Sequence, residues 1–161
     1  MILSDAEIAD LIALPKIILN PRARRKEQKG SARINYSIQA ENAQFEIYVR
    51  QNLKVRNAFS CGLMYIAPNS ERVTLMRCNG SDHPHGNPLE GVATIEAGCH
   101  IHIATQRYME IGRKPEHFAE KTELYTDVDG ALATLLMLCN VSGLNCELPS
   151  TQLALFGAHE P

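Results

Sequence analysis

Residues 32–79 read ARINYSIQAENAQFEIYVRQNLKVRNAFSCGLMYIAPNSERVTLMRCN, and this stretch decides the fold. It contains four runs that are rich in β-branched and aromatic residues, at 32–40, 44–52, 58–67 and 71–79. The intervals between the runs are short and turn-like, as is typical of hairpins. The pattern therefore predicts four antiparallel strands in a meander.

The flanking segments add a helix and a fifth strand. Ser4 followed by Glu7 forms a capping box, and apolar residues at helical spacing continue until Pro15. We therefore expect a short N-terminal helix. The segment CHIHIATQRYMEI, residues 99–111, is predicted to be the fifth strand, and residues 80–98 are predicted to be the loop that joins it to the fourth.

The last third of the chain has helical periodicity. We expect one helix at 115–125, with proline at its first position, and a second at 127–141, capped by Asp127 or Thr126. The predicted fold class is α+β, a curved antiparallel β-sheet of about five strands with the N-terminal and C-terminal helices packed on one face. No repeat or linker divides the chain, so we expect a single domain over 1–161.

Composition limits the classes of protein. A chain of 161 residues can bury about two-thirds of its unfolded surface, so it needs no disulfide or metal for stability. Its five cysteines are odd in number and form no CxxC pair, which indicates reduced thiols. We expect neither a signal peptide nor a membrane span, and a cytoplasmic location. A surface tail is expected at about 143–161.

A basic loop is expected at about residues 20–33, where six Lys and Arg residues stand against one Glu, a net charge of +5 that leaves −7 for the rest of the chain. Clustered cations gain affinity for phosphate backbones by releasing counterions. The candidate nucleic-acid contacts are Arg22, Arg24, Arg25, Lys26 and Lys29. The alternative is a solvated, mobile loop, because the run has no aromatic residue for base stacking.

Four of the six histidines lie in two H-x-H pairs, His83/His85 in HPHGNP and His100/His102 in HIHI. Residues two apart on a strand share a face, so His100 and His102 should project together while their apolar neighbours face the core. If the adjoining strands are neighbours, all four imidazoles and Arg77 converge in one pocket. We expect His117 and His159 to lie outside this cluster.

Three interpretations of the histidines remain open. A histidine pair can act as general base and general acid in cleaving an RNA phosphodiester, with an arginine stabilising the charge on the phosphorane. Alternatively, His83, His85, His100 and His102 can bind Zn²⁺ or another divalent metal, although HExxH and cupin spacings are absent. The third interpretation is structural. The sequence also lacks P-loop, dinucleotide-binding and GxSxG motifs.

The order LMRCNG, HPHGNP, G-x-HIHI and YMEIG resembles a family of small bacterial and phage-associated domains of unknown function, over about residues 14 to 140. More distantly it is similar to the TumE-like toxins of toxin–antitoxin pairs, which implies action on RNA. The resemblance points to Arg77, His85, Asn87, Pro88, His100 and His102. His83 is an addition, and Ala104-Thr105 stands where the family usually has a tyrosine.

The resulting expectation is a toxin-type endoribonuclease. In this hypothesis His102 or His100 is the general base, His85 is the general acid, and Arg77 with Asn87 binds the phosphate. No cofactor is then required, and RNA and a cognate antitoxin are the expected partners. The alternatives are a metal-dependent hydrolase and a non-catalytic, phage-related binding protein that acts on a defence-system protein or nucleic acid. A homodimer is compatible with each.

Overall fold

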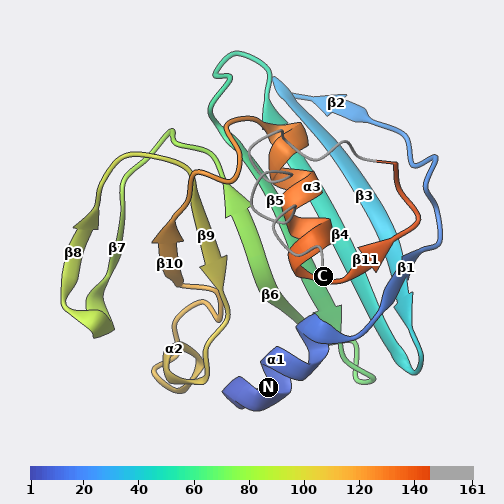
Figure 1. Ribbon diagram of the computed structural model, residues 1–161, viewed down its shortest axis with the longest axis horizontal. Coiled ribbons are helices and arrows are strands. Elements are labelled where there is room, and N and C mark those ends of the chain that lie inside the picture. The colour runs from blue at the N-terminus through green and yellow to red at the C-terminus, as the bar shows by residue number, and fades with distance from the viewer. Residues whose placement is uncertain (146–161) are drawn as a thin grey trace, which may run out of the picture.

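The computed structural model describes residues 1–145, which form an α+β fold built on one large, mostly antiparallel sheet (Figure 1). The sheet has nine strands in the order β10-β9-β6-β5-β4-β3-β1-β11, with β2 paired to β3. A separate two-stranded sheet is made by β7 and β8. The strands are β1 (Lys16–Ile18), β2 (Lys26–Gln28), β3 (Ser31–Ala40), β4 (Ala43–Asn52), β5 (Phe59–Ile66), β6 (Arg72–Asn79), β7 (His85–Asn87), β8 (Val92–Ile95), β9 (His100–Ile103), β10 (Phe118–Lys121) and β11 (Val141–Ser142).

The predicted meander is confirmed. Strands β3, β4, β5 and β6 follow one another as antiparallel neighbours, and β9 adds itself antiparallel to β6. The sheet exceeds the five expected strands because short segments pair at both edges. At one edge β1 joins β3 and then pairs in parallel with β11; at the other, β10 pairs with β9.

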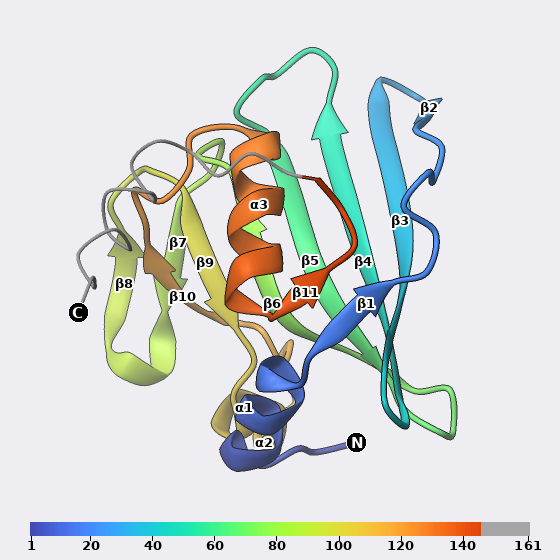
Figure 2. The same ribbon diagram turned by 45° about the vertical axis from the view of Figure 1, so that its right-hand side comes forward.

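Two of the predicted helices are confirmed with their caps. Helix α1 (Asp5–Ala13) begins at the Ser4/Glu7 capping box, in which both hydrogen bonds are present. Helix α3 (Val128–Leu138) begins at Asp127, whose carboxylate accepts from the Gly130 amide at 2.8 Å. Helix α3 is apolar and contacts β4, β5 and β6, and it lies across the sheet in Figures 1 and 2. That α1 shares this face remains a prediction.

Two predicted elements are wrong. The helix expected at 115–125 is instead strand β10, because its backbone pairs with β9 and this tertiary contact overrides local helical preference. The strand expected at 99–111 ends at Ile103, and the chain then forms the short helix α2 (Gln106–Glu110). The loop at 80–98 contains the β7–β8 hairpin and a 3₁₀ turn, Pro88–Glu90.

The two faces of the sheet differ in chemistry. Cys61 and Cys78 are paired across β5 and β6, and the Cys61 thiol lies 3.8 Å from the Val128 carbonyl of α3. The alternate positions, Gly62 and Arg77, therefore point away from α3. We call these the covered face and the polar face. The covered face holds the core, including Ile47, Leu63, Leu75 and Leu135, each with 0% exposure.

Other features of the sequence have their place in this fold. The basic loop contains the short hairpin of β2 and β3, turned by Lys29 and Gly30, which both have positive φ. Four cysteine side chains are buried among the described residues, namely Cys61, Cys78, Cys99 and Cys139. Most of the predicted surface tail, 146–161, lies outside the described residues, as do Cys146 and His159. No helix in residues 1–145 is long and apolar enough to cross a membrane.

Candidate metal centre in a polar cleft

Strands β6 and β9 bring four polar side chains together on the polar face. The register pairs Arg77 with His102 and Asn79 with His100. Because directly opposite residues share a face, all four side chains point the same way. Cys78 and Ile101, the residues between them on the two strands, point to the covered face, as the alternation in the sequence predicted.

His85 reaches the same place from β7. Asn87 holds this strand in position, since its amide nitrogen donates to the Ala119 carbonyl at 2.7 Å and its amide oxygen accepts from the Ala119 amide at 3.0 Å. Gly86 allows the close approach of β8, because an added Cβ would collide with the Ala93 carbonyl. Asn87 is therefore fully engaged with the backbone and positions its neighbour His85.

Each of the three imidazoles is anchored by one ring nitrogen to a backbone carbonyl. His85 Nε2 donates to the His117 carbonyl at 2.8 Å, His100 Nδ1 to Gly98 at 3.1 Å, and His102 Nδ1 to Glu116 at 3.0 Å. A carbonyl only accepts, so these three nitrogens carry the protons. In the neutral tautomer, the second nitrogen of each ring carries a lone pair instead of a proton.

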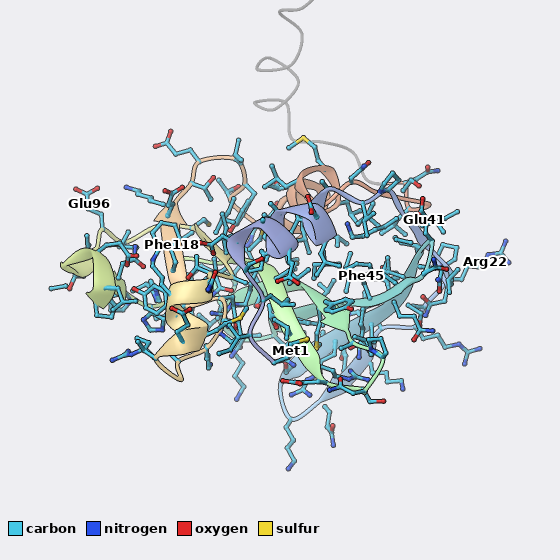
Figure 3. The ribbon with its side chains drawn as sticks, turned by 90° about the horizontal axis from the view of Figure 1, so that it is seen from below. Met1, Arg22, Glu41, Phe45, Glu96 and Phe118 are labelled. Carbon is cyan, nitrogen blue, oxygen red and sulfur yellow. The ribbon has the colours of Figure 1, made fainter. Side chains whose placement is uncertain are left out.

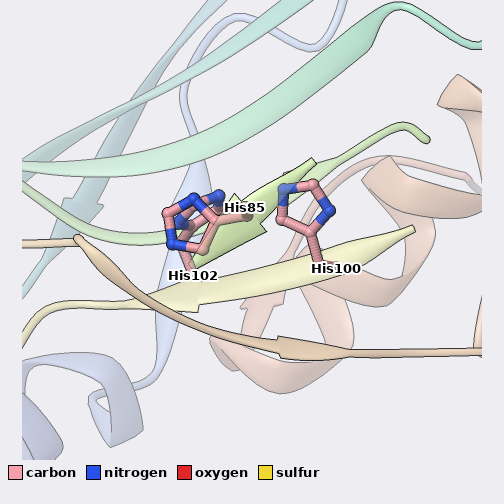
Figure 4. Close-up of side chains that lie close together, drawn as sticks. All are labelled: His85, His100 and His102. Atoms are coloured by element: carbon pink, nitrogen blue, oxygen red, sulfur yellow. The ribbon is translucent and has the colours of Figure 1, made fainter. Parts of the chain in front are cut away.

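These three rings form a compact cluster, shown in Figure 4. The nitrogen atoms that they offer lie within 4.8 Å of one another, and the ring centroids of His85 and His102 are 4.6 Å apart. His100 Nε2 is buried and has no hydrogen-bond partner. His102 Nε2 accepts a long bond of 3.3 Å from Asn79. His85, His100 and His102 therefore have the geometry to hold a metal ion.

Burial keeps the strand histidines neutral. His100 and His102 are 2% and 1% exposed, less accessible than the sequence pattern suggested. Desolvation, aided by the positive charge of Arg77, lowers the pKa of His102 to about 2. The pKa of His100 is also lowered, mainly by burial. A neutral imidazole is the form that binds metals, whereas the loss of basicity weakens a role as general base.

Two further histidines lie at the margin of the cluster. The exposed His83 ring is 5.4 Å from that of His100, and its Nδ1 lies 2.9 Å from the Asp82 carboxylate. His117 was expected outside the cluster, but its half-buried ring is 5.2 Å from that of His85. That expectation failed because strand β10 pairs with β9, and His117 directly precedes this strand, which brings it to the site.

A cleft of about 730 Å³ extends from the cluster across the polar face. Its lining includes His83, His85, His102 and His117, and the cations Arg50, Arg77, Arg113 and Lys114. Arg77 is 3.6 Å from the buried Glu116 carboxylate, and its Nε is buried without a partner. The cleft therefore carries positive charge next to the three lone pairs.

An aromatic ring, Tyr48, lies beneath the guanidinium of Arg50, which lines the cleft. Gly62 leaves room for the Tyr48 ring, because an added Cβ would overlap that ring. The guanidinium of Arg50 lies 4.8 Å from the centre of the same ring. Burial raises the pKa of Tyr48, with the nearby Arg77 acting in the opposite direction. Tyr48 thus remains an uncharged support for Arg50.

The sequence identified the centre of the site but not its surroundings. Arg77, His85, His100 and His102 do meet, whereas the Asn87 side chain bonds the Ala119 backbone and does not line the cleft. Glu116 and His117 were missed because their segment was assigned to a helix, and Arg113 and Lys114 lie between the strand and the helix that were expected there. Arg50 was also missed, although the alternation of Glu46, Tyr48 and Arg50 on its strand signals a polar face.

The basic loop begins far from the histidines. In Figure 3, Arg22 and Glu96, which follows β8, lie at opposite ends of the molecule. Arg22, Arg24, Arg25, Lys26 and Lys29 are all exposed, and Arg25 forms an ion pair with Glu27 at 3.2 Å. Of these five cations, only Lys26 is placed on the polar face by strand pairing, because it lies opposite Arg33 on β3.

The chain belongs to a family of unknown function, DUF6978, whose model matches residues 3–142. The match includes every residue of the cluster and cleft. No curated protein and no solved structure matches the chain. The chemistry of the site must therefore be argued from its own residues.

Proposed function

We propose that this member of the DUF6978 family is a metal-dependent hydrolase of phosphodiester bonds, with His85, His100 and His102 as the metal ligands. One observation carries the proposal: each ring donates a proton to a backbone carbonyl through one nitrogen, and the three rings each offer a nitrogen atom within 4.8 Å of the others. Such outer hydrogen bonds fix the tautomer and orientation of histidine ligands in metal sites.

Zinc suits this set of ligands. Three protein ligands with an open fourth position are typical of catalytic zinc sites. A Zn–N distance of about 2.1 Å separates tetrahedral ligand atoms by roughly 3.4 Å, so small ring rotations would complete the site. The hydrogen bond between Asn79 and His102 Nε2 is long, and metal binding would replace it. The ion would supply an activated water and a Lewis acid.

The cations that line the cleft would bind a phosphate group of the substrate. Arg77 faces the histidines from the neighbouring strand and retains a donor, Nε, without a partner. A guanidinium in that position would stabilise negative charge on a phosphoryl oxygen in the transition state. RNA is the substrate that the sequence resemblance to TumE-like toxins suggests, and it remains part of the proposal.

Metal analysis of the purified protein tests this function. We expect stoichiometric zinc in the wild type, and at least a tenfold weaker affinity in His85→Ala, His100→Ala and His102→Ala. His83→Ala is the matched control, because this imidazole lies outside the three-histidine set, and it should retain zinc. Circular dichroism establishes folding. Metal-free wild type that does not take up zinc, manganese or cobalt would overturn the proposal.

A second candidate is the metal-free endoribonuclease, favoured by the contact between His83 and Asp82. A carboxylate at 2.9 Å from Nδ1 orients a histidine as a general base, and this pair is exposed at the cleft. RNA cleavage that survives a chelator and disappears in His83→Ala would select this candidate. Growth arrest on inducible expression, lost in His100→Ala/His102→Ala, would support a toxin with either chemistry.

A further inference from the structure

A row of cations crosses the polar face of the sheet. Lys26 on β2 lies opposite Arg33 on β3, and Arg33 lies opposite Arg50 on β4. The same register row continues through β5 and β6 to β9, by way of Ser60, Asn79 and His100. Because directly opposite residues share a face, the three cations and the histidine stand on one line across the sheet.

This arrangement is unfavourable for the isolated protein. Like charges directly opposite each other on adjacent strands repel and destabilise the sheet. Among the described residues, no carboxylate forms an ion pair with Lys26, Arg33 or Arg50. All three side chains are exposed, and Glu27, which alternates with Lys26 on β2, pairs with Arg25 instead. An anionic partner would remove the repulsion.

The cleft connects Arg50 to the histidine cluster, while Lys26 and Arg33 lie outside its lining. Its lining begins at Ser31, beside the β2–β3 turn, and passes Arg50, Ser60 and Asn79 before it reaches His102. Adjacent strands are about 4.8 Å apart, so the five steps from Lys26 to His100 cover roughly 24 Å. A linear anion with several charges fits this path better than a single phosphate.

We propose that Lys26, Arg33 and Arg50 form a track for the phosphate backbone of a single-stranded nucleic acid, which leads into the three-histidine centre. This inference rests on the proposed function, since it names the substrate class of the same site. A single line of cations matches one strand, whereas a duplex presents two backbones. Among the described residues, the aromatic rings beside the row and its cleft, Tyr48 and Phe59, are both buried and offer no base-stacking platform. The track therefore contacts phosphates without reading the base sequence.

Binding of a fluorescein-labelled uridine homopolymer, measured by anisotropy in a chelator, tests the track. Arg33→Gln/Arg50→Gln should weaken binding at least tenfold and reduce the slope of log K against log salt by about 1.4, since each lost contact removes about 0.7 from the slope. Arg22→Gln/Arg24→Gln is the matched control, because it removes two equally exposed cations from the same basic loop without touching the row. It should leave affinity within about twofold at moderate salt.

Four outcomes would overturn the track: no binding of the homopolymer, equal loss in the control variant, tighter binding of duplex RNA, or preference for an acidic polypeptide such as polyglutamate. A thymidine homopolymer of equal length identifies the contacted group. Equal affinity assigns the contacts to phosphate alone, and tighter RNA binding adds the 2′-hydroxyl; both results retain the track.

The experiment separates this inference from the proposed function. Because the chelator removes the metal, row-dependent binding is measured without hydrolysis. A protein that takes up no metal but binds RNA through Arg33 and Arg50 would overturn the hydrolase and retain the track. A zinc protein whose RNA binding ignores both arginines would overturn the track and retain the metal centre.

Discussion

The two faces of the central sheet differ in whether their buried polar side chains are hydrogen-bonded within the protein. On the covered face, the ammonium of Lys16 is 3% exposed, yet it donates to the carbonyls of Ile12, Leu14 and Cys139 at 2.7–3.0 Å. The Thr134 hydroxyl likewise donates to Gly130 within α3. This face is apolar, and its polar side chains are satisfied by the protein itself.

The polar face leaves buried atoms without partners. Among the described residues, four buried side-chain polar atoms lack a hydrogen bond, and three of them, Arg77 Nε, Asn79 Oδ1 and His100 Nε2, lie in adjoining register positions. Each unsatisfied buried group costs about 1–3 kcal/mol, so such clustering needs an explanation. The covered face thus satisfies its own polar groups, and the unpaired atoms of the polar face support the ligand site proposed there.

Truncating the core should produce the largest change in stability. Leu135 in α3 is 0% exposed, so Leu135→Ala should lower the free energy of unfolding by about 3 kcal/mol through lost burial and a cavity. Urea denaturation measures this. The control is Leu138→Ala in the same helix, where the side chain is 37% exposed and the loss should be much smaller. A large loss of zinc affinity in folded Leu135→Ala protein would contradict the separation of the faces.

Asn87→Ala should damage the polar face more selectively. It removes both hydrogen bonds to Ala119 and should cost about 2 kcal/mol of stability. The freed β7 strand would also release His85, so zinc affinity should fall even though no ligand is changed. Calorimetric titration with zinc measures this effect. Unaltered zinc affinity would show that His85 is not a ligand or is held by other contacts.

Filling the space between Gly62 and the Tyr48 ring should lower stability by a smaller amount than the two changes above. Gly62→Ala places a methyl group against the ring and should cost about 1–2 kcal/mol by overpacking. A double-mutant cycle with Tyr48→Ala provides the control, because the second change removes the ring and should relieve the clash. If the two losses of stability are additive, the ring does not occupy the space above Gly62.

The free energy of unfolding should depend on pH because the ammonium group of Lys16 is buried on the covered face. Burial lowers the pKa of Lys16 in the folded protein to about 8. The unfolded chain, with a lysine pKa of about 10.4, binds more protons between these values, so stability should rise as pH increases from about 8 to about 10.4. Urea denaturation at pH 8 and pH 10 should show this increment in the wild type and not in Lys16→Met. An identical pH profile for both proteins would contradict it.

Local sequence signals predicted the fold where neighbouring residues carry the information. The β-rich runs at 32–79 became four consecutive strands, and the caps at Ser4 and Asp127 began their helices. The prediction failed at 115–125, where PEHFAEKTELY has helical character but Phe118–Lys121 within it form an edge strand. Pairing with β9 supplies backbone hydrogen bonds that no local pattern can report.

Strand alternation alone was enough to tell which histidines share a face, since a strand alternates its side chains with a period of two. Thus the H-x-H spacing was enough to place His100 and His102 together, with Ile101 opposite. The identity of the carbonyls that accept from the histidine rings, and of the cations on the same face of the sheet, could be read only from the folded chain. Those carbonyls and cations come from segments far apart in the chain, and their meeting depends on strand register rather than on local spacing.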